Sequence, residues 1–201
     1  MPRELLVLPY QTSLTPRELE AIANGSAEKF RGAYSSVRIL PARTTTETEL
    51  AFFSGLLYTW DILENTPASR LSGEKLTENL HKEFGSQHVL VYTDLATVSI
   101  EADRKQNMSG KAVSERLMDE NPRGKAYVSP RIQAIDKNDR IEIYTITSTH
   151  ELGHLMPWQL PHHHFEVDEV PCVMQERFEH SDLAPDFCDK CSERIDRTKD
   201  L

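Results

Sequence analysis

The sequence predicts an α/β fold, because segments with the spacing of strands alternate with segments that have the spacing of helices. Two apolar runs, residues 5–8 and residues 88–93, have the composition of buried strands. Helices are predicted from residue 16 to about residue 30 and from residue 72 to residue 84. With 38% hydrophobic residues among 201, the chain is long enough for one sizeable core, so a single domain is expected.

The first helix has clear start signals. Thr15 and Glu18 have the spacing of a capping box, and Pro16 stands at the first helical position. Apolar side chains then follow a helical period as far as Phe30. The run 37–40, which precedes a proline, predicts the next strand.

The sequence signals for the later elements vary in strength. Gly85 ends the predicted helix over residues 72–84, and residues 44–65 favour neither helix nor strand. Residues 102–123 are polar and contain turn residues, which predicts a loop or irregular segment. Residues 126–135 return to the spacing of a strand.

Charge and cysteine content narrow the class of protein. The net charge is −9 with a pI near 5.4, and there is no dense Lys/Arg run, so nucleic-acid binding is not expected. The apolar run 5–8 is too short for a signal-peptide core, and nothing reaches the length of a membrane span. These features predict a cytoplasmic protein. Its three cysteines argue against a disulfide framework and leave metal binding open.

Residues 150–154 read His-Glu-Leu-Gly-His. Two imidazoles at positions i and i+4 lie on one helix face, so His150 and His154 can both reach one zinc ion. Glu151 lies at the side of that face, where it can contact a metal-bound water without occupying the metal. This spacing predicts a zinc site with Glu151 as a general base.

The residues around this motif predict a helix. Asp139 and Glu142 have the spacing of a capping box, and Pro157 predicts an end near Met156. The β-branched run 141–147 could also begin as a strand. Helical spacing predicts one buried stripe, formed by Ile141, Thr145, Ser148, Leu152 and Leu155.

Further residues that can bind metal follow within forty positions. They are His162, His163, His164, Cys172, Cys188 and Cys191, of which the last two form a Cys-x-x-Cys pair. Such crowding beside the His-Glu-Leu-Gly-His motif favours metal binding over unrelated surface histidines and thiols.

With these motifs the sequence resembles the archaemetzincins, a family of metzincin-clan zinc metallopeptidases. Their pattern couples HExxHxxGxxH and a following cysteine to a Cys-x-Met and a distal Cys-x-x-Cys. Residues 150–154 match HExxH, residues 172–174 match Cys-x-Met, and residues 188–191 match the closing pair. The match covers about residues 124–192, and it implies that Met174 lies beneath the metal.

The turn after the HExxH motif departs from the family pattern. The family glycine would fall at Pro157, the third histidine would fall at Leu160, and the cysteine expected after that histidine is absent. A short insertion reconciles all three differences. His162 as the third ligand needs the smallest insertion and places His163 at the cysteine position, while His163 with His164 is nearly as good.

The resemblance implies a metzincin-like zincin fold, which is a mixed twisted sheet with an active-site helix. Residues 1–201 would form one domain, with an α/β lobe over residues 1–156 and a metal-binding segment over residues 157–201. It implies two zinc ions. The catalytic ion would be bound by His150, His154 and one of His162, His163 and His164, and the structural ion by Cys172, Cys188, Cys191 and a neighbouring histidine.

The implied activity is hydrolysis of peptide bonds in a peptide or protein substrate by zinc-activated water. The substrate is expected to extend along an edge strand within residues 126–132. Two alternatives remain open. One is a catalytically inactive metzincin-like domain that acts in structure or partner binding, and the other is a different HExxH clan in which Glu176 or Glu179 is the third ligand.

Overall fold

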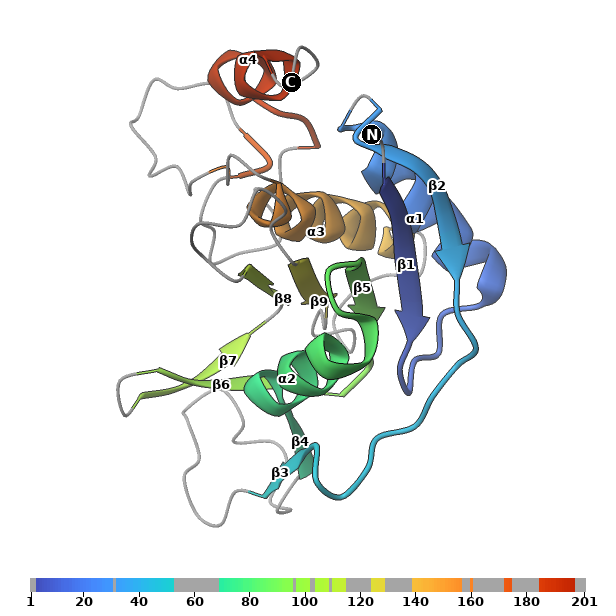
Figure 1. Cartoon of the computed structure of the whole chain (residues 1–201), viewed down its shortest axis with the longest axis vertical. Coiled ribbons are helices and arrows are strands. Elements are labelled where there is room, and N and C mark those ends of the chain that lie inside the picture. Colours follow the sequence, from blue (N-terminus) through green and yellow to red (C-terminus); the bar gives the residue numbers. More distant parts are fainter. Residues whose placement is uncertain are drawn as a thin grey trace.

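The computed structural model describes most of the N-terminal half, the helix that carries residues 150–154 and parts of the C-terminal segment. The described residues are 3–30, 32–52, 69–95, 97–101, 104–108, 110–114, 124–128, 139–156, 160, 172–174 and 185–197. They form two sheets and four helices, arranged as in Figure 1. No helix among these residues is long and apolar enough to cross a membrane.

A five-stranded sheet is the centre of the molecule, with the strand order β2-β1-β5-β9-β8. β1 (Arg3–Pro9), β2 (Tyr34–Ile39), β5 (His88–Tyr92) and β9 (Gly124–Val128) are parallel, whereas β8 (Gly110–Ser114) pairs antiparallel with β9. The strand predicted within residues 126–135 therefore begins at residue 124, and residues 129–135 lie outside the described part.

The two central strands are buried on both faces, as their continuous apolar sequences predict. In β1, Leu5 and Val7 point to one face and Leu6 and Leu8 to the other, because successive strand side chains alternate. β5 lies in register beside β1, with Leu5 opposite His88. Each face therefore needs its own layer of helices.

Two helices form where their local signals predict. α1 (Pro16–Glu28) begins with the complete capping box of Thr15 and Glu18. α2 (Gly73–Phe84) is capped by Ser72 and ends at Gly85, whose φ of 53° is readily adopted by glycine. α1 and α3 cover one face of the sheet and α2 covers the other (Figure 1).

Part of the segment predicted as a loop is strand, so that prediction is wrong. β3 (Leu50–Phe52), β4 (Ser69–Ser72), β6 (Thr97–Glu101) and β7 (Arg104–Met108) form a second, four-stranded sheet, and β8 joins the main one. Backbone hydrogen bonds hold such strands whatever the polarity of their side chains. The partner of β8 is β9, ten residues further along the chain, and local composition does not reveal such a pairing.

Helix α3 (Arg140–Leu155), which carries residues 150–154, forms despite its β-branched run. Hydroxyl groups in this run and directly after it donate to carbonyl oxygens four residues earlier, for example Thr147 to Ile143 at 2.9 Å and Ser148 to Tyr144 at 2.6 Å. These bonds satisfy polar side chains inside the protein, so the helix can bury them. Its end at Leu155, with an extended Met156 before Pro157, is as predicted.

Two predictions for α3 are wrong. Asp139 has helical φ and ψ and makes no capping hydrogen bond, so it does not form a capping box with Glu142. Ile141 is 40% exposed rather than part of the buried stripe. The buried face is instead set by Tyr144, which is fully buried against Tyr92 of β5 with ring centroids 5.9 Å apart.

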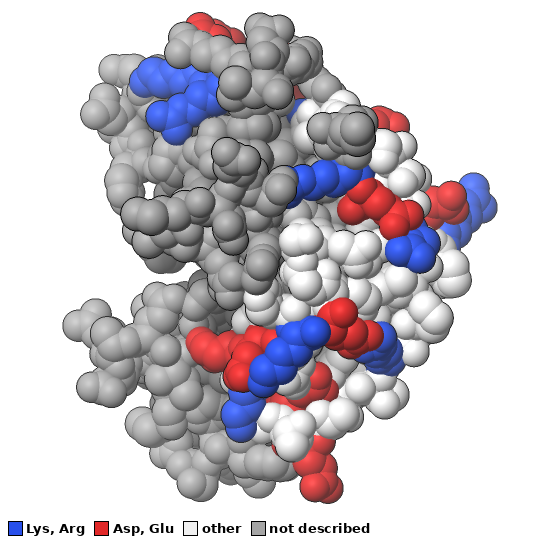
Figure 2. Space-filling view, viewed as in Figure 1, with Lys and Arg blue, Asp and Glu red and all other residues white. Residues whose placement is uncertain are grey.

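The described surface carries charges of both signs side by side (Figure 2). On α2, Lys82 pairs with Glu78 at 2.5 Å, and Glu83 receives two hydrogen bonds from Arg43. Exposed pairs of this kind contribute little stability.

α4 (Asp189–Arg197), the last described helix, places Ile195 in the same core cluster as the end of α3.

Candidate metal centre

The last two turns of α3 bring the two motif histidines together. The Nε2 atoms of His150 and His154 lie 3.1 Å apart, and the two rings meet edge to face at 82°. This follows from their i, i+4 spacing on one helix face. Both histidines are partly exposed.

The other ring nitrogen of each histidine faces a backbone oxygen. Nδ1 of His150 lies 2.8 Å from the Val173 carbonyl oxygen, and Nδ1 of His154 lies 3.0 Å from that of Leu160. Because a carbonyl oxygen can only accept, each Nδ1 carries the proton and donates. In the neutral rings, both Nε2 lone pairs then point into the same small space, where a shared cation would stabilise them.

Glu151 follows His150 on the helix and is 6% exposed. An ionised carboxylate this deeply buried is costly unless polar groups or a cation surround it. Glu151 therefore lies inside the protein, one residue after His150 on α3.

Gly153 allows a close approach beneath the histidines. A Cβ atom at this position would lie 3.0 Å from Cε of Met174 and 2.5 Å from its Sδ, and the second distance is shorter than real Cβ atoms tolerate. Met174 is fully buried there, beside Leu160. The structure thus places Met174 under the helix turn that carries His150 and His154.

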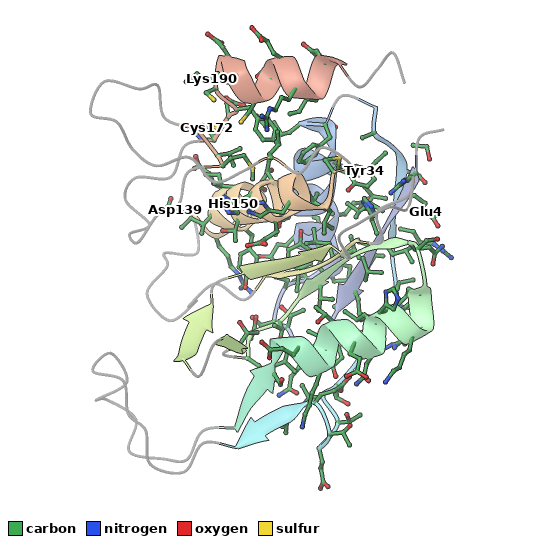
Figure 3. All side chains as sticks on the ribbon, turned by 60° about the vertical axis from the view of Figure 1, so that its left-hand side comes forward. Glu4, Tyr34, Asp139, His150, Cys172 and Lys190 are labelled. Atoms are coloured by element: carbon green, nitrogen blue, oxygen red, sulfur yellow. The ribbon has the colours of Figure 1, made fainter. Side chains whose placement is uncertain are left out.

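The three cysteines form a second group of potential ligands. The Sγ atoms of Cys172, Cys188 and Cys191 lie within 4.8 Å of one another, and none is in a disulfide. Cys172 and Cys191 are buried, and Cys188 is partly exposed. In Figure 3, Cys172 lies between His150 on α3 and Lys190 at the start of α4.

Hydrogen bonds distinguish the thiols. The bond from the Cys191 thiol lowers the pKa of Cys172 to about 5, and backbone N–H groups of Cys188 and Met174 act in the same direction. The N–H of Cys188 lies 3.3 Å from the Cys172 sulfur. The same thiol–thiol bond, with burial, raises the pKa of Cys191. These contacts favour the thiolate form of Cys172, and the thiolate is the form that binds metals.

Both groups of side chains fit zinc. Tetrahedral zinc with bonds of about 2.0–2.1 Å to nitrogen would place two imidazole nitrogens about 3.3 Å apart. The observed 3.1 Å between the Nε2 atoms is close to this value. Zinc–sulfur bonds of about 2.3 Å would place thiolates about 3.8 Å apart, which three sulfurs within 4.8 Å can reach by small movements.

The remaining predicted ligands lie outside the described residues. These are His162, His163 and His164, as well as the alternative third ligands Glu176 and Glu179. The described part does include Leu160, at the position where the family's third histidine would fall. It is fully buried, and its backbone accepts from His154 and donates to the Gly153 carbonyl at 3.2 Å. The Leu160 side chain therefore cannot serve as a third metal ligand.

Sequence reasoning missed three residues of this centre. Leu160 and Val173 act through their backbone carbonyls, so their side chains carry no sign of the role. Gly153 is needed because it lacks a Cβ atom. A glycine inside an otherwise good helix was the one available signal, because glycine there usually has a packing or functional reason.

Comparison with known proteins places this geometry in a known fold. No protein-family model and no curated protein matches the sequence. The structure is similar to archaemetzincin from Methanopyrus kandleri, with a TM-score of 0.62, 18% identity, and coverage of 100% of this chain and 97% of that one.

Two further solved structures are similar to this chain in fold. Archaemetzincin from Archaeoglobus fulgidus, complexed with malonate, has a TM-score of 0.59 at 17% identity, covering 95% of this chain and 99% of that one. A zinc-dependent peptidase from Methanocorpusculum labreanum has a TM-score of 0.62 at 17% identity, covering 94% and 99%. The chain therefore has the archaemetzincin fold. The α/β, metzincin-like fold class predicted from the sequence is confirmed.

Proposed function

We propose that this chain is a zinc-dependent peptidase that hydrolyses peptide bonds in a peptide or protein substrate. The observation that carries the proposal is the 3.1 Å approach of the His150 and His154 Nε2 atoms, both with Nδ1 bonded to a backbone carbonyl. Glu151 lies beside them on the same helix. Structural neighbours described as archaemetzincins and as a zinc-dependent peptidase support the same activity.

Two zinc ions complete the proposal. His150, His154 and one of His162, His163 and His164 hold the catalytic ion. The three cysteines, with a neighbouring histidine, hold a structural ion. When bound, the catalytic zinc supplies Lewis acidity, which lowers the pKa of water and stabilises developing negative charge on oxygen.

Glu151 is the general base of the proposed reaction. Its carboxylate accepts the proton of the attacking water and returns it to the leaving amine, which a single buried carboxylate beside the ligands can do in turn. His150 and His154 keep their Nδ1 protons on the carbonyls of Val173 and Leu160, so Nε2 stays available to the metal.

The substrate strand requires a correction of the sequence prediction. β9, which begins the segment 126–132, is paired with β5 and β8 on its two sides and so is not an edge. Among the described strands of the main sheet, β8 is the edge beside β9, and it lies against α3. An extended peptide can add to β8 through backbone hydrogen bonds and so reach the end of α3.

Replacement of Glu151 by Gln tests the catalytic role. The amide cannot accept the proton, so we expect hydrolysis of a peptide library to fall by about 10²–10⁴-fold while zinc remains bound. Glu142→Gln, an exposed position on the same helix, is the matched control and should leave hydrolysis unchanged. Full activity of Glu151→Gln would reject the assignment.

Zinc stoichiometry tests the two sites separately. Two zinc ions per chain are expected. His150→Ala should lose one, and Cys188→Ser should lose the other, while His81→Ala on α2 should keep both. Retention of both ions in His150→Ala or in Cys188→Ser would contradict the assignment of ligands.

A second function is favoured by one observation. Leu160 is buried at the family's third histidine position, so the turn after α3 differs from the family pattern. An inactive metzincin-like domain would bind one zinc tightly on the cysteines and hydrolyse no member of a peptide library.

A different HExxH clan, with Glu176 or Glu179 as ligand, would keep its catalytic zinc after loss of His162, His163 and His164.

A further inference from the structure

Three consecutive residues, Cys172, Val173 and Met174, connect the cysteine cluster to the histidine pair. Cys172 contributes its sulfur to the cysteine cluster, and the Val173 carbonyl oxygen receives the His150 Nδ1 proton at 2.8 Å. Met174 packs against Gly153, between the two histidines in sequence. All three residues are at least 96% buried, so none can move without disturbing its neighbours.

The two histidines depend on different parts of the chain for their orientation. His154 is held by Leu160, whose own N–H bonds back to Gly153 on the same helix, so this contact is local to the end of α3. His150 is held by Val173, 23 residues further along the chain. A hydrogen bond of this kind fixes the tautomer and the ring orientation of a metal-binding histidine.

The position of Val173 is set in turn by the segment that contains the other two cysteines. Its N–H donates to the Asp186 carbonyl at 2.8 Å, two residues before Cys188. Asp186 pairs with Lys29 at the end of α1, and Phe187 packs against Phe30 with ring centroids 5.4 Å apart. Weak hydrogen bonds to sulfur, from the thiols and from the Cys188 N–H, join the cysteines to one another, and a tetrahedral metal would add stronger metal–sulfur bonds.

We propose that a metal on Cys172, Cys188 and Cys191 positions His150 through the Val173 carbonyl, so that the histidine pair binds its zinc more tightly when the cysteine cluster is filled. Val173 and the cysteines are then positioning residues for His150, in addition to stabilising the C-terminal segment. This inference rests on the proposed function in taking the histidine pair as a zinc site.

Because two binding equilibria that affect each other do so reciprocally, loading the cysteines must favour the histidine pair by the same factor as the reverse. Loss of a hydrogen-bond partner behind a metal-binding histidine typically weakens metal affinity about 10–100-fold. We expect a coupling of this size.

The test measures metal affinity at the histidines with the cysteine cluster filled and empty. The purified chain is stripped of metal and titrated with Co²⁺, with or without one prior equivalent of Cd²⁺, a soft ion that prefers thiolates. Cobalt on the histidines is followed by its visible d–d bands, and cadmium on the cysteines by its thiolate charge-transfer band. We expect the dissociation constant of cobalt at the histidines to fall 10–100-fold after cadmium loading.

Two variants separate this coupling from a general loss of stability. In Cys188→Ser, cadmium loading should no longer tighten cobalt binding. In Leu76→Ala, a core truncation on the opposite face of the sheet, the tightening should persist. Should Cys188→Ser fail to fold, the comparison of the wild-type chain with and without cadmium still decides the question.

The outcomes also distinguish this proposal from the proposed function. If cobalt affinity at the histidines is the same with and without cadmium, while the chain hydrolyses peptides, the coupling is wrong and the peptidase stands. If cadmium tightens cobalt binding but no peptide is hydrolysed, the coupling stands and the peptidase is wrong. If the histidines bind no metal, both are wrong.

Discussion

On one face of the five-stranded sheet, α2 packs Leu76 and Leu80 against the apolar side chains of β1 and β5. On the opposite face, α1 and α3 bury hydroxyl groups and the Glu151 carboxylate among their apolar side chains. The α3 face also receives the C-terminal cysteine segment.

The difference lies in what each face requires of its neighbours. The apolar contacts of Leu76 and Leu80 are non-directional, so these side chains need complementary volume. Buried polar groups need partners at fixed positions, and α3 obtains them from its own carbonyls, from Tyr92 and from distant backbone. We infer that the α2 face mainly stabilises the fold and that the α3 face mainly fixes geometry. The predictions below test this division.

The largest effect on stability is expected on the α2 face. Leu76 is fully buried, so Leu76→Ala should lower the free energy of unfolding by about 2–5 kcal/mol, through lost burial and a residual cavity. Zinc affinity at the histidines should not change. Denaturant unfolding and chelator competition measure the two quantities, and a parallel loss of zinc affinity would break the comparison.

Compared with Leu76→Ala, Gly153→Ala is expected to cause a smaller loss of stability but a larger loss of metal affinity. The Cβ atom of Gly153→Ala would collide with Sδ of Met174, so the sulfur must move, at a cost of about 1–3 kcal/mol. Zinc binding at the histidines should weaken in the same variant. Gly25→Ala on α1 is the matched control, because its Cβ atom would meet Thr145 at an ordinary 3.4 Å. Equal effects of the two substitutions would contradict the role of Gly153.

Loss of one hydrogen bond on the α3 face should have a moderate effect. Burial raises the pKa of Tyr92, so its hydroxyl stays protonated and donates to Ser148 at 2.8 Å, while Ser148 donates to the Tyr144 carbonyl. Tyr92→Phe should therefore cost about 0.5–1.5 kcal/mol in unfolding free energy. Urea unfolding of this variant beside the wild type gives the value, and no measurable change would argue against directional contacts on this face.

The smallest effect is expected from Glu49, at the edge of the α2 face. Burial acts to raise its pKa, but hydrogen bonds from Tyr10, Thr46 and Asn79 outweigh burial and lower it. A carboxyl group whose pKa is lower in the folded state stabilises the protein at pH values above its pKa in the unfolded state. This stabilisation is lost as the pH falls through the pKa of the folded state. Glu49→Gln should therefore lower stability near neutral pH and have less effect in acid.

Thermal unfolding of both proteins between pH 3 and pH 7 checks this prediction. A stability difference that stays constant over the range would show that the Glu49 charge makes no contribution.

The sequence located the elements whose signals are local. α1 and α2 begin at Thr15 and Ser72 as predicted, because a capping side chain bonds to backbone only a few residues away. The strands β1 and β5 were equally clear, since burial on both faces demands continuous apolar runs. Sequence signals failed for β7 and β8, which are polar and depend on partner strands, and for Ile141, whose exposure depends on how α3 sits on the sheet.

The sequence by itself determined which groups this protein can offer a metal. A helix with histidines at i and i+4 must present both on one face, and the family pattern pointed to the Cys-x-Met and Cys-x-x-Cys residues. Only the tertiary structure decided what holds these groups. The Val173 and Leu160 carbonyls orient the two imidazoles, and Gly153 admits the Met174 sulfur. Every residue has a carbonyl, so no side-chain pattern can show which carbonyls the folded chain will bring beside a histidine.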